Sequence, residues 1–323
     1  RYRDLLSLDF DPIKDGHIMV GSKAGLYEFQ DGKFIKCYNK DNTSVITSPM
    51  SKSYTIISSV KYDQTGKLWL LNSLGDNNIL SYNQASKEWN TYSHSEISDN
   101  DKYNLTGITL GKKYNYIWFV NNFYDKNIFY QYDYHNDKLT MYGPTFTNED
   151  GNTITPNYVH CTAEDRYGNI WIGTTSGPLY ITVSEIKNES KIFTQHKVPR
   201  NDGTNYADYL LANSNIRSIA IDGANQKWMG TDNGVYLISD DCNTQIYHFN
   251  TENSPLISNI IHSIAINNNT GKVYFATDKG LCSFNNGIIS PNAEMTKDNI
   301  YAYPNPVKPN YTGKINIVGL SFN

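Results

Sequence analysis

Two histidines and an arginine occupy equivalent positions in three successive copies of a repeated motif. His160, Arg217 and His262 each lie five residues before the Asp or Asn that opens a tight turn. Arginine donates paired hydrogen bonds to anions, and histidine can donate or accept a hydrogen bond near neutral pH. If the fold brings the three copies together, these side chains could bind an anionic ligand or a sugar. The alternative is that they only line a water-filled channel.

Further polar and aromatic candidates lie in loops beside these positions. Two long connections, Gly143–Asn157 and Lys197–Ser214, join successive copies of the motif. Long loops on a rigid scaffold are frequent binding sites. The loop candidates for ligand binding are Asp232, Asp278, Lys279, Arg200, Tyr206 and Tyr209.

Signatures of catalysis are absent. The chain has no G-x-S-x-G elbow, no H-E-x-x-H motif, no P-loop and no G-x-G-x-x-G motif. Glu164 and Asp165 are adjacent at a strand end, so their side chains point to opposite sides and suit an acid/base pair poorly. Asp9, Asp11 and Asp15 crowd one loop, but their spacing is not that of a calcium loop, which favours a solvated turn over a cation site. We therefore expect no catalytic residue, no metal and no cofactor.

The element that must position the candidates is a short strand with Trp at its centre, which recurs along the chain. The Trp position holds Met19, Trp69, Trp118, Trp171, Trp228 and Tyr274. Four of the five Trp residues fall there. The copies recur roughly every 50 residues, which is the period of propeller blades. We expect this row of Trp side chains to fill the core between neighbouring blades and not to serve as a platform for sugars.

The flanks of the Trp strand repeat as well. A short apolar strand precedes the turn before it, and a third strand follows the turn after it. A fourth, more polar segment closes most copies, at Lys33–Tyr38, Glu88–Tyr92, Lys138–Tyr142, Lys191–His196 and Thr244–Phe249. No segment has the 3.6-residue apolar stripe of a helix. Four strands per copy predict an all-β fold, a β-propeller with six visible blades; a β-sandwich would not repeat at this length.

Composition narrows the class of partner. The net charge of −4 lacks the basic excess expected for a nucleic-acid partner. Aromatic residues make up 13% of the chain, including 26 Tyr, which suits strands and flat ligands such as sugar rings. No apolar run is long enough to span a membrane. The four Cys residues form no C-x-x-C pair, and we expect Cys161 and Cys282 to be buried within strands.

The repeat ends before the C-terminus. We predict a propeller over residues 1–290, a linker over 291–298 and the beginning of a second β-sandwich module over 299–323. Three Pro residues within Tyr301–Pro309 favour an extended path, and Lys314–Val318 alternates like a strand. A segment of this size cannot bury a core of its own, so it packs on the propeller or continues into a longer sandwich.

The motif Ile-x-x-Asp-x-x-Gly-Asn-Ile-Trp-Ile-Gly-Thr-x-x-Gly-Leu resembles the two-component regulator propeller repeat of Bacteroidetes. Residues 160–180 match it best, and the resemblance extends over about residues 1–285. The tail from Tyr301 to Val307 is similar to the start of the sorting-type β-sandwich that follows PorZ-type propellers of the type IX secretion system. This resemblance implies an exported protein, a second propeller before this one, and usually seven blades. Six visible copies therefore mean a six-bladed propeller or a seventh blade outside the chain.

Three functions are compatible with these observations. The first is a non-enzymatic, PorZ-like binding or scaffold protein in the periplasm or at the cell surface, with a glycan, a lipopolysaccharide or a secretion protein as partner. The second is the periplasmic glycan-sensing domain of a hybrid two-component histidine kinase. The third is a propeller lyase or glycosidase, for which we find no paired acid and base. The sequence does not indicate an oligomeric state.

Overall fold

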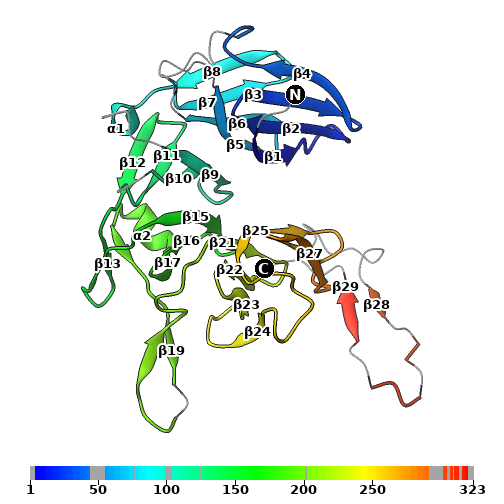
Figure 1. Ribbon diagram of the computed structural model, residues 1–323. Helices are drawn as coiled ribbons and strands as arrows, with labels where there is room; N and C mark the ends of the chain where they lie inside the picture. Colours follow the sequence, from blue (N-terminus) through cyan, green and yellow to red (C-terminus); the bar gives the residue numbers. More distant parts are fainter. Residues whose placement is uncertain are drawn as a thin grey trace. The chain divides into compact units, whose positions relative to one another are not determined.

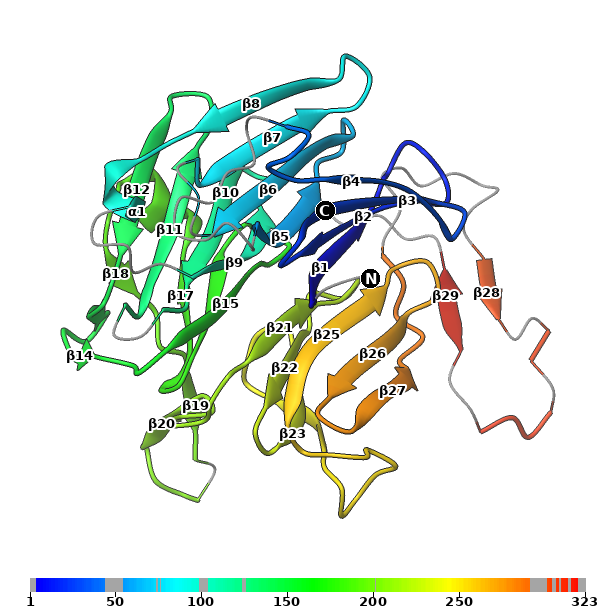
Figure 2. The ribbon, with the colours of Figure 1, turned by 45° about the horizontal axis from the view of Figure 1, so that its top comes forward.

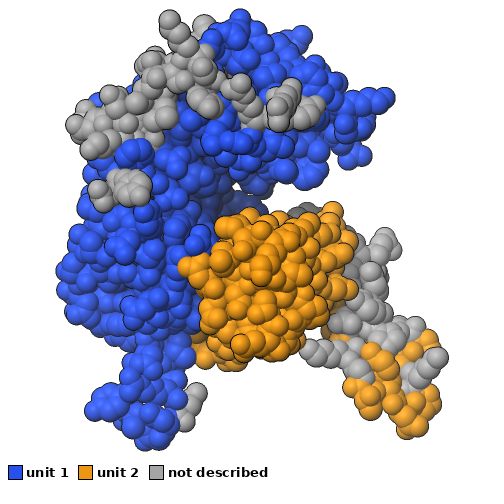
Figure 3. All heavy atoms as spheres, viewed as in Figure 1, with its two compact units in different colours: residues 1–219 blue, residues 220–323 orange. Residues whose placement is uncertain are grey.

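The computed structural model describes residues 4–43, 55–73, 75, 77–98, 104–123, 126–200 and 202–290, and short stretches between 301 and 318. The chain divides into two compact units, residues 1–219 and 220–323, which are described separately below (Figure 3). No helix in the described ranges has the length and apolar character needed to cross a membrane.

The first unit opens with three sheets of the same design, blades one to three (Figures 1 and 2). Each is an antiparallel meander of four strands in chain order. The strands are β1 (Leu5–Phe10), β2 (His17–Ser22), β3 (Gly25–Gln30), β4 (Lys33–Tyr38), β5 (Ile56–Tyr62), β6 (Lys67–Ser73), β7 (Ile79–Asn83), β8 (Glu88–Tyr92), β9 (Leu105–Leu110), β10 (Tyr116–Asn121), β11 (Ile128–Asp133) and β12 (Lys138–Tyr142). A single helical turn, α1 (Ser95–Ser98), lies between blades two and three. The four-strand repeat predicted from the sequence is confirmed in these blades.

Blade four departs from this design. Its sheet has three strands, β15 (Val159–Glu164), β16 (Ile170–Thr174) and β17 (Gly177–Ile181), and the helix α2 (Val183–Lys187) follows. The fourth strand predicted at Lys191–His196 is only partly formed. Thr194 bridges to Tyr180 of β17 through two backbone hydrogen bonds, whereas β18 (Ile192–Phe193) pairs with β13 (Phe146–Asn148). Sequence patterns missed α2 because five residues are too few to show a helical stripe.

The second unit carries two further blades. Blade five is the four-stranded meander β21 (Ser218–Ile221), β22 (Lys227–Thr231), β23 (Gly234–Ile238) and β24 (Gln245–Phe249), and the unit boundary falls within β21. Blade six has three strands, β25 (Ile261–Asn267), β26 (Lys272–Thr277) and β27 (Gly280–Asn285). The strands β28 (Tyr301–Tyr303) and β29 (Asn316–Val318) form a separate two-stranded sheet. The predicted linker, residues 291–298, lies outside the described residues.

The Trp row lies in the core between blades, as predicted. Trp69 of blade two packs with Ile117 and Tyr132 of blade three, and its exposed fraction is 1%. Trp118 packs in the same way against Ile172 of blade four. Blades five and six repeat the arrangement through Trp228. A buried, close-packed indole cannot also be a platform for a ligand.

A turn aspartate holds each of three Trp side chains. In blade four, Asp165 Oδ1 accepts hydrogen bonds from the backbone N–H groups of Tyr167 and Asn169, each at 2.9 Å. Its Oδ2 accepts a bond from Trp171 Nε1 at 3.1 Å. The same set of bonds recurs around Asp63 with Trp69 and around Asp222 with Trp228. The fourth turn residue adopts a positive φ, which is why Gly or Asn occupies it: Gly66, Gly168 and Asn225.

Blade three lacks this aspartate, and its neighbour replaces it. Lys112 stands at the turn position, and the carboxylate of Glu164 in blade four accepts hydrogen bonds from the backbone N–H groups of Lys112 and Lys113 at 2.7 and 3.1 Å. Glu164 and Asp165 therefore serve two different turns. Such separate engagement suits an acid/base pair poorly.

The burial predicted for Cys161 and Cys282 is only partly correct. Both residues are half-buried, and all four Cys residues are free thiols. The sulfur of Cys161 is nevertheless enclosed against Gly173, and burial raises its pKa to about 12 despite hydrogen bonds from the Gly173 and Ile219 backbone. It is a packing residue and not a nucleophile.

We predict that changing Asp165 to Asn destabilises the first unit by about 1–3 kcal/mol, because an amide donor would replace the oxygen that accepts the Trp171 and Asn169 bonds. Chemical denaturation measures the loss. As a matched control, Asn at the exposed turn residue Asp202 should change stability by less than about 0.5 kcal/mol. Equal effects of the two substitutions would contradict the role assigned to the indole bond.

We also predict that Cys161 resists thiol reagents at pH 8 in the folded protein. A pKa of about 12 leaves roughly one thiol in ten thousand as thiolate at that pH, against about a quarter for an ordinary Cys. Mass spectrometry after brief treatment with iodoacetamide checks this, with the denatured chain as the fully labelled control. Rapid labelling of native Cys161 would show that the site opens readily.

Candidate functional site

The candidate His residues are the extra residues of β-bulges. In blade four, Val159 pairs with Thr174 and Cys161 pairs with Gly173, so His160 has no partner of its own in the ladder. In blade six, His262 lies in the same way between the paired residues Ile261 and Ser263. Blades one, two and three carry the same irregularity at Leu6, Ser58 and Gly107. A bulge re-aims one side chain away from the regular pleat, and bulges are frequent beside functional sites.

His160 is held by the segment that leads into blade five. Its Nε2 lies 2.8 Å from Asn215 Oδ1, and its ring stacks on Tyr158 at a centroid distance of 5.9 Å. The backbone N–H of Ile216 bonds to the carbonyl of Thr174 at 2.9 Å, which fixes the same segment against blade four. Arg217 follows directly and is half-buried, as His160 is. The structure therefore anchors His160 beside the 215–217 segment.

His262 lies in the second unit, where its side chain is exposed on β25. Its convergence with His160 and Arg217 stays a prediction, because the two units are described separately. Asp232, Asp278 and Lys279 are also exposed in this unit. They occupy the turns after β22 and β26, which are fixed by Thr231 and Thr277.

These two turns share one hydrogen-bond pattern. Each Thr hydroxyl donates to the carbonyl of the Gly three residues later, at 2.9 and 2.8 Å, and accepts the N–H of the residue two positions on. The turns are therefore rigid, and their charged tips face solvent.

The two long connections are partly folded hairpins and not plain loops. The first contains β13 and β14 (Thr153–Ile154), and the second contains β19 (Lys197–Pro199) and β20 (Ala207–Tyr209). Their junction is polar: Tyr209 donates from its hydroxyl to Asp150 at 2.8 Å, and Lys197 pairs with the same carboxylate at 2.7 Å. These partners hold the pKa of Asp150 below its usual value. The hydroxyl group of Tyr209 is therefore engaged in a hydrogen bond that joins the two hairpins.

The other two candidates of this hairpin lie further along it. Arg200 forms a two-point ion pair with Asp208, with distances of 2.9 and 2.6 Å, and its guanidinium lies over the Tyr206 ring. Tyr206 is 69% exposed. The hairpin projects from the body of the first unit (Figure 1), so that this aromatic ring is presented to solvent.

The aspartates of the first blade are engaged in structure. Asp11 Oδ1 accepts the backbone N–H groups of Ile13 and Lys14, and its Oδ2 lies 3.2 Å from Nδ1 of the buried His17. Asp9 bonds to Lys61 and to the backbone of Tyr62 in blade two. Within the described ranges no cluster of His, Cys, Asp and Glu has the geometry to hold a metal ion.

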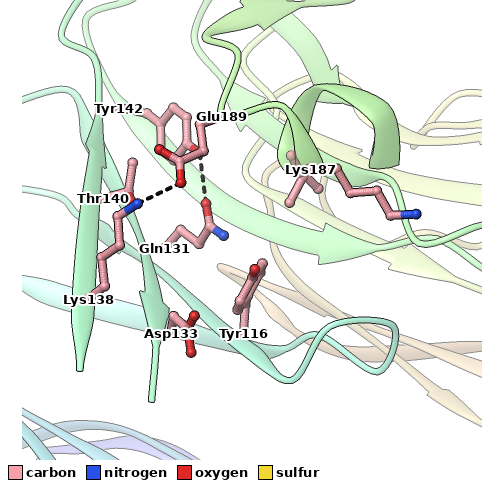
Figure 4. A pocket seen from close by; sticks show the side chains of 9 residues that line it. Tyr116, Gln131, Asp133, Lys138, Thr140, Tyr142, Lys187 and Glu189 are labelled. Carbon is pink, nitrogen blue, oxygen red and sulfur yellow. Dashed lines mark hydrogen bonds and ion pairs between the residues drawn. The ribbon is translucent and has the colours of Figure 1, made fainter. Parts of the chain in front are cut away.

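A pocket between blade three and helix α2 was not anticipated from the sequence (Figure 4). Its volume is about 80 Å³. The lining residues are Tyr116, Gln131, Asp133, Lys138, Thr140, Tyr142, Ile186, Lys187 and Glu189. The alternation of strand side chains could have assigned the residues of β10, β11 and β12 to one face. The helix that covers this face had no visible signal except the Thr182-x-x-Glu185 capping box.

The pocket is polar and mostly internally paired. Lys138 Nζ lies 2.7 Å from Glu189 Oε1, and the Tyr142 hydroxyl donates to Gln131 Oε1 at 2.8 Å. Burial, together with Glu189 and Tyr116, raises the pKa of Tyr142 to about 12, and burial also raises the pKa of Tyr116. Both hydroxyls are therefore neutral at physiological pH and can donate or accept hydrogen bonds.

Comparison with known proteins supports the fold. Residues 153–176, around β15 and β16, match the family described as two component regulator propeller. No curated protein matches the sequence at a significant level.

The structure is similar to PorZ of Porphyromonas gingivalis, described as an essential bacterial surface component of the type-IX secretion system. The two share 26% sequence identity with a TM-score of 0.75, over 98% of this chain and 43% of PorZ. The chain thus spans less than half of the length of PorZ.

Other similar structures are more distant. Virginiamycin B lyase from Staphylococcus aureus has 14% identity and a TM-score of 0.57, over 87% of this chain and 84% of the lyase, which shows a shared fold alone. The extracellular domain of a B. thetaiotaomicron protein described as a hybrid two component system has 18% identity and a TM-score of 0.46, over 88% of this chain and 38% of that one. This chain therefore has an all-β propeller fold, with a two-component regulator propeller repeat in blade four and PorZ-like architecture.

Proposed function

We propose that this chain is a non-enzymatic, exported propeller that binds a ligand or serves as a scaffold, in a role similar to that of PorZ. The observation that carries this proposal is the similarity to PorZ over 98% of the chain. Because PorZ is described as a bacterial surface component, we assign this chain to the periplasm or the cell surface. The proposed partner is a surface polysaccharide, a lipopolysaccharide or a protein of the secretion machinery.

The proposed ligand site is the set of re-aimed side chains His160, Arg217 and His262. Two of them occupy bulges on innermost strands, and Arg217 stands at the equivalent position in blade five. A cationic guanidinium beside imidazoles suits anionic or hydroxyl-rich glycans. Glu164 and Asp165, the adjacent carboxylates of blade four, are bonded to two different turns, which favours binding over turnover at this strand.

A sensory role is the second candidate. It is favoured by the match of residues 153–176 to the two-component regulator propeller family. In that case the full-length gene would also encode a membrane helix and a histidine kinase. Reading the coding sequence on either side of this segment separates the sensor from the PorZ-like protein.

We predict that Ala at His160, Arg217 and His262 together weakens glycan binding at least about tenfold, which corresponds to roughly 1.4 kcal/mol. A glycan array followed by calorimetric titration of the glycans that bind measures the loss. Thermal unfolding should be nearly unchanged, because none of the three side chains belongs to the apolar core.

Leu6→Ala is the matched control, since Leu6 occupies the same bulge position in blade one without polar chemistry. Affinity that survives the triple substitution would remove these residues from the ligand site. Turnover of a polysaccharide by the wild-type protein would revive the enzyme hypothesis.

A further inference from the structure

The pocket of Figure 4 lies beneath an insertion in blade four. The helix α2 stands between β17 and the segment that bridges to β17 at Thr194, where blades one, two, three and five have a turn between their third and fourth strands. After β17 the chain enters α2 through a complete capping box: Thr182 accepts the N–H of Glu185, and Glu185 accepts the N–H of Thr182. Ile186 anchors the helix, with an exposed fraction of 5%. A five-residue helix is stable only with such tertiary support. Ile186 and Lys187 of the helix, and the following Glu189, line the pocket on the side of blade four.

The face of blade three beneath the helix changes character along its strands. At the start of β11 and the end of β12, Phe129 and Tyr142 pack with Phe193 in the core between the two blades. Towards the end of β11 and the start of β12, the residues that face each other across the strands are polar. Gln131 lies opposite Thr140, and Asp133 lies opposite Tyr116 and Lys138. Ordinary inter-blade packing places apolar side chains on such a face. A polar face that is covered but not filled is the geometry of a small-ligand site.

The polar groups are arranged around one space. In Figure 4, Tyr116, Gln131 and Asp133 face the cavity, whereas Lys187 points away from it. Lys187 Nζ lies 5.7 Å from the centroid of the Tyr114 ring, which agrees with that orientation. At about 80 Å³ the cavity has room for roughly half a dozen water-sized groups. A hexopyranose has twelve non-hydrogen atoms, so the cavity can enclose one hydroxyl-bearing edge of such a ring and not the whole ring.

The charged groups around the cavity indicate whether an anionic, an apolar or a neutral polar ligand fits best. Lys138 is paired with Glu189, and Lys187 is turned to Tyr114, so neither ammonium group is directed at a ligand. Hydrogen bonds from His135 and Asn136 lower the pKa of Asp133 against the opposing effect of burial, so its carboxylate stays ionised. An anion would meet uncompensated negative charge, and an apolar ligand would leave these groups unpaired.

We propose that this cavity is a second, peripheral binding site for a single neutral pyranose unit of a glycan. The sugar ring would lie against Tyr116, and its hydroxyl groups would bond to Asp133, Gln131 and Thr140. Tyrosine combines an apolar ring face with a polar tip, and carboxylate and amide side chains take up vicinal hydroxyls. The site belongs entirely to the first unit and does not depend on the bulge residues His160 and Arg217.

Saturation-transfer NMR with glucose, galactose, mannose and N-acetylglucosamine tests the proposal on the whole chain. We expect at least one sugar to bind at millimolar concentration. Two substitutions should each reduce its affinity at least fivefold: Thr140→Leu, which fills the cavity, and Tyr116→Ala, which removes the ring. Asn90→Leu is the matched control, because Asn90 holds the corresponding position of the outer strand in blade two, and binding should survive it.

Each result bears on the proposal. No binding of any of the four sugars by the wild-type chain overturns it, and so does binding that survives both Thr140→Leu and Tyr116→Ala. Loss of binding only in the triple variant of His160, Arg217 and His262 would assign the sugar to the bulge site instead. Thermal unfolding of every variant excludes loss of fold as the cause, and Tyr116→Phe, which keeps the ring, should restore most of the affinity.

Discussion

The hydrogen bond between a turn aspartate and a buried indole is the interaction on which blades two, four and five depend. One carboxylate closes the turn through two backbone N–H groups and also satisfies the indole N–H of the Trp in the next strand. A buried indole without a partner would lose much of the stabilisation that its burial provides. In blade two the indole of Trp69, bonded to Asp63, also packs against blade three, so there a single side chain links local turn geometry to the contact between blades.

Blade three, which lacks the turn aspartate, shows the same requirement for a carboxylate at the turn. With Lys112 in place of the aspartate, the turn still needs a carboxylate, and Glu164 supplies it from the neighbouring blade. A bond within one blade has become a bond between two. The backbone N–H of Val60 donates to Ser7 Oγ and that of Ile108 donates to Ser59 Oγ, which joins the other innermost strands in the same way. Blades that cannot bury their own faces are thereby fixed to their neighbours.

A scaffold held in this way can present side chains that lie outside its apolar core. The bulges place one such residue at the same point of successive innermost strands, where the chemistry varies from Leu6 to His160. The outer edge of blade four is a second place where a blade differs from the others. A helix is inserted there after the third strand, and it lies over a polar part of the neighbouring blade. Both features place side chains of different chemistry on the same repeated framework, which suits a binding protein.

The sequence by itself determined the blade. The turn residues, the Trp row and the length of the repeat follow from local conformational preferences and from the alternation of apolar and polar residues. Both can be read directly from the sequence. The positions of His160, Arg217 and His262 within the repeat could be predicted in the same way, although not the bulges that re-aim them. The tertiary structure alone decided how Tyr209 is occupied by Asp150, where Glu164 is used, and that a pocket lies beneath α2. The bonds of Tyr209 and Glu164 join residues 59 and 52 positions apart, and no local pattern records which partner a polar side chain will find across a blade boundary.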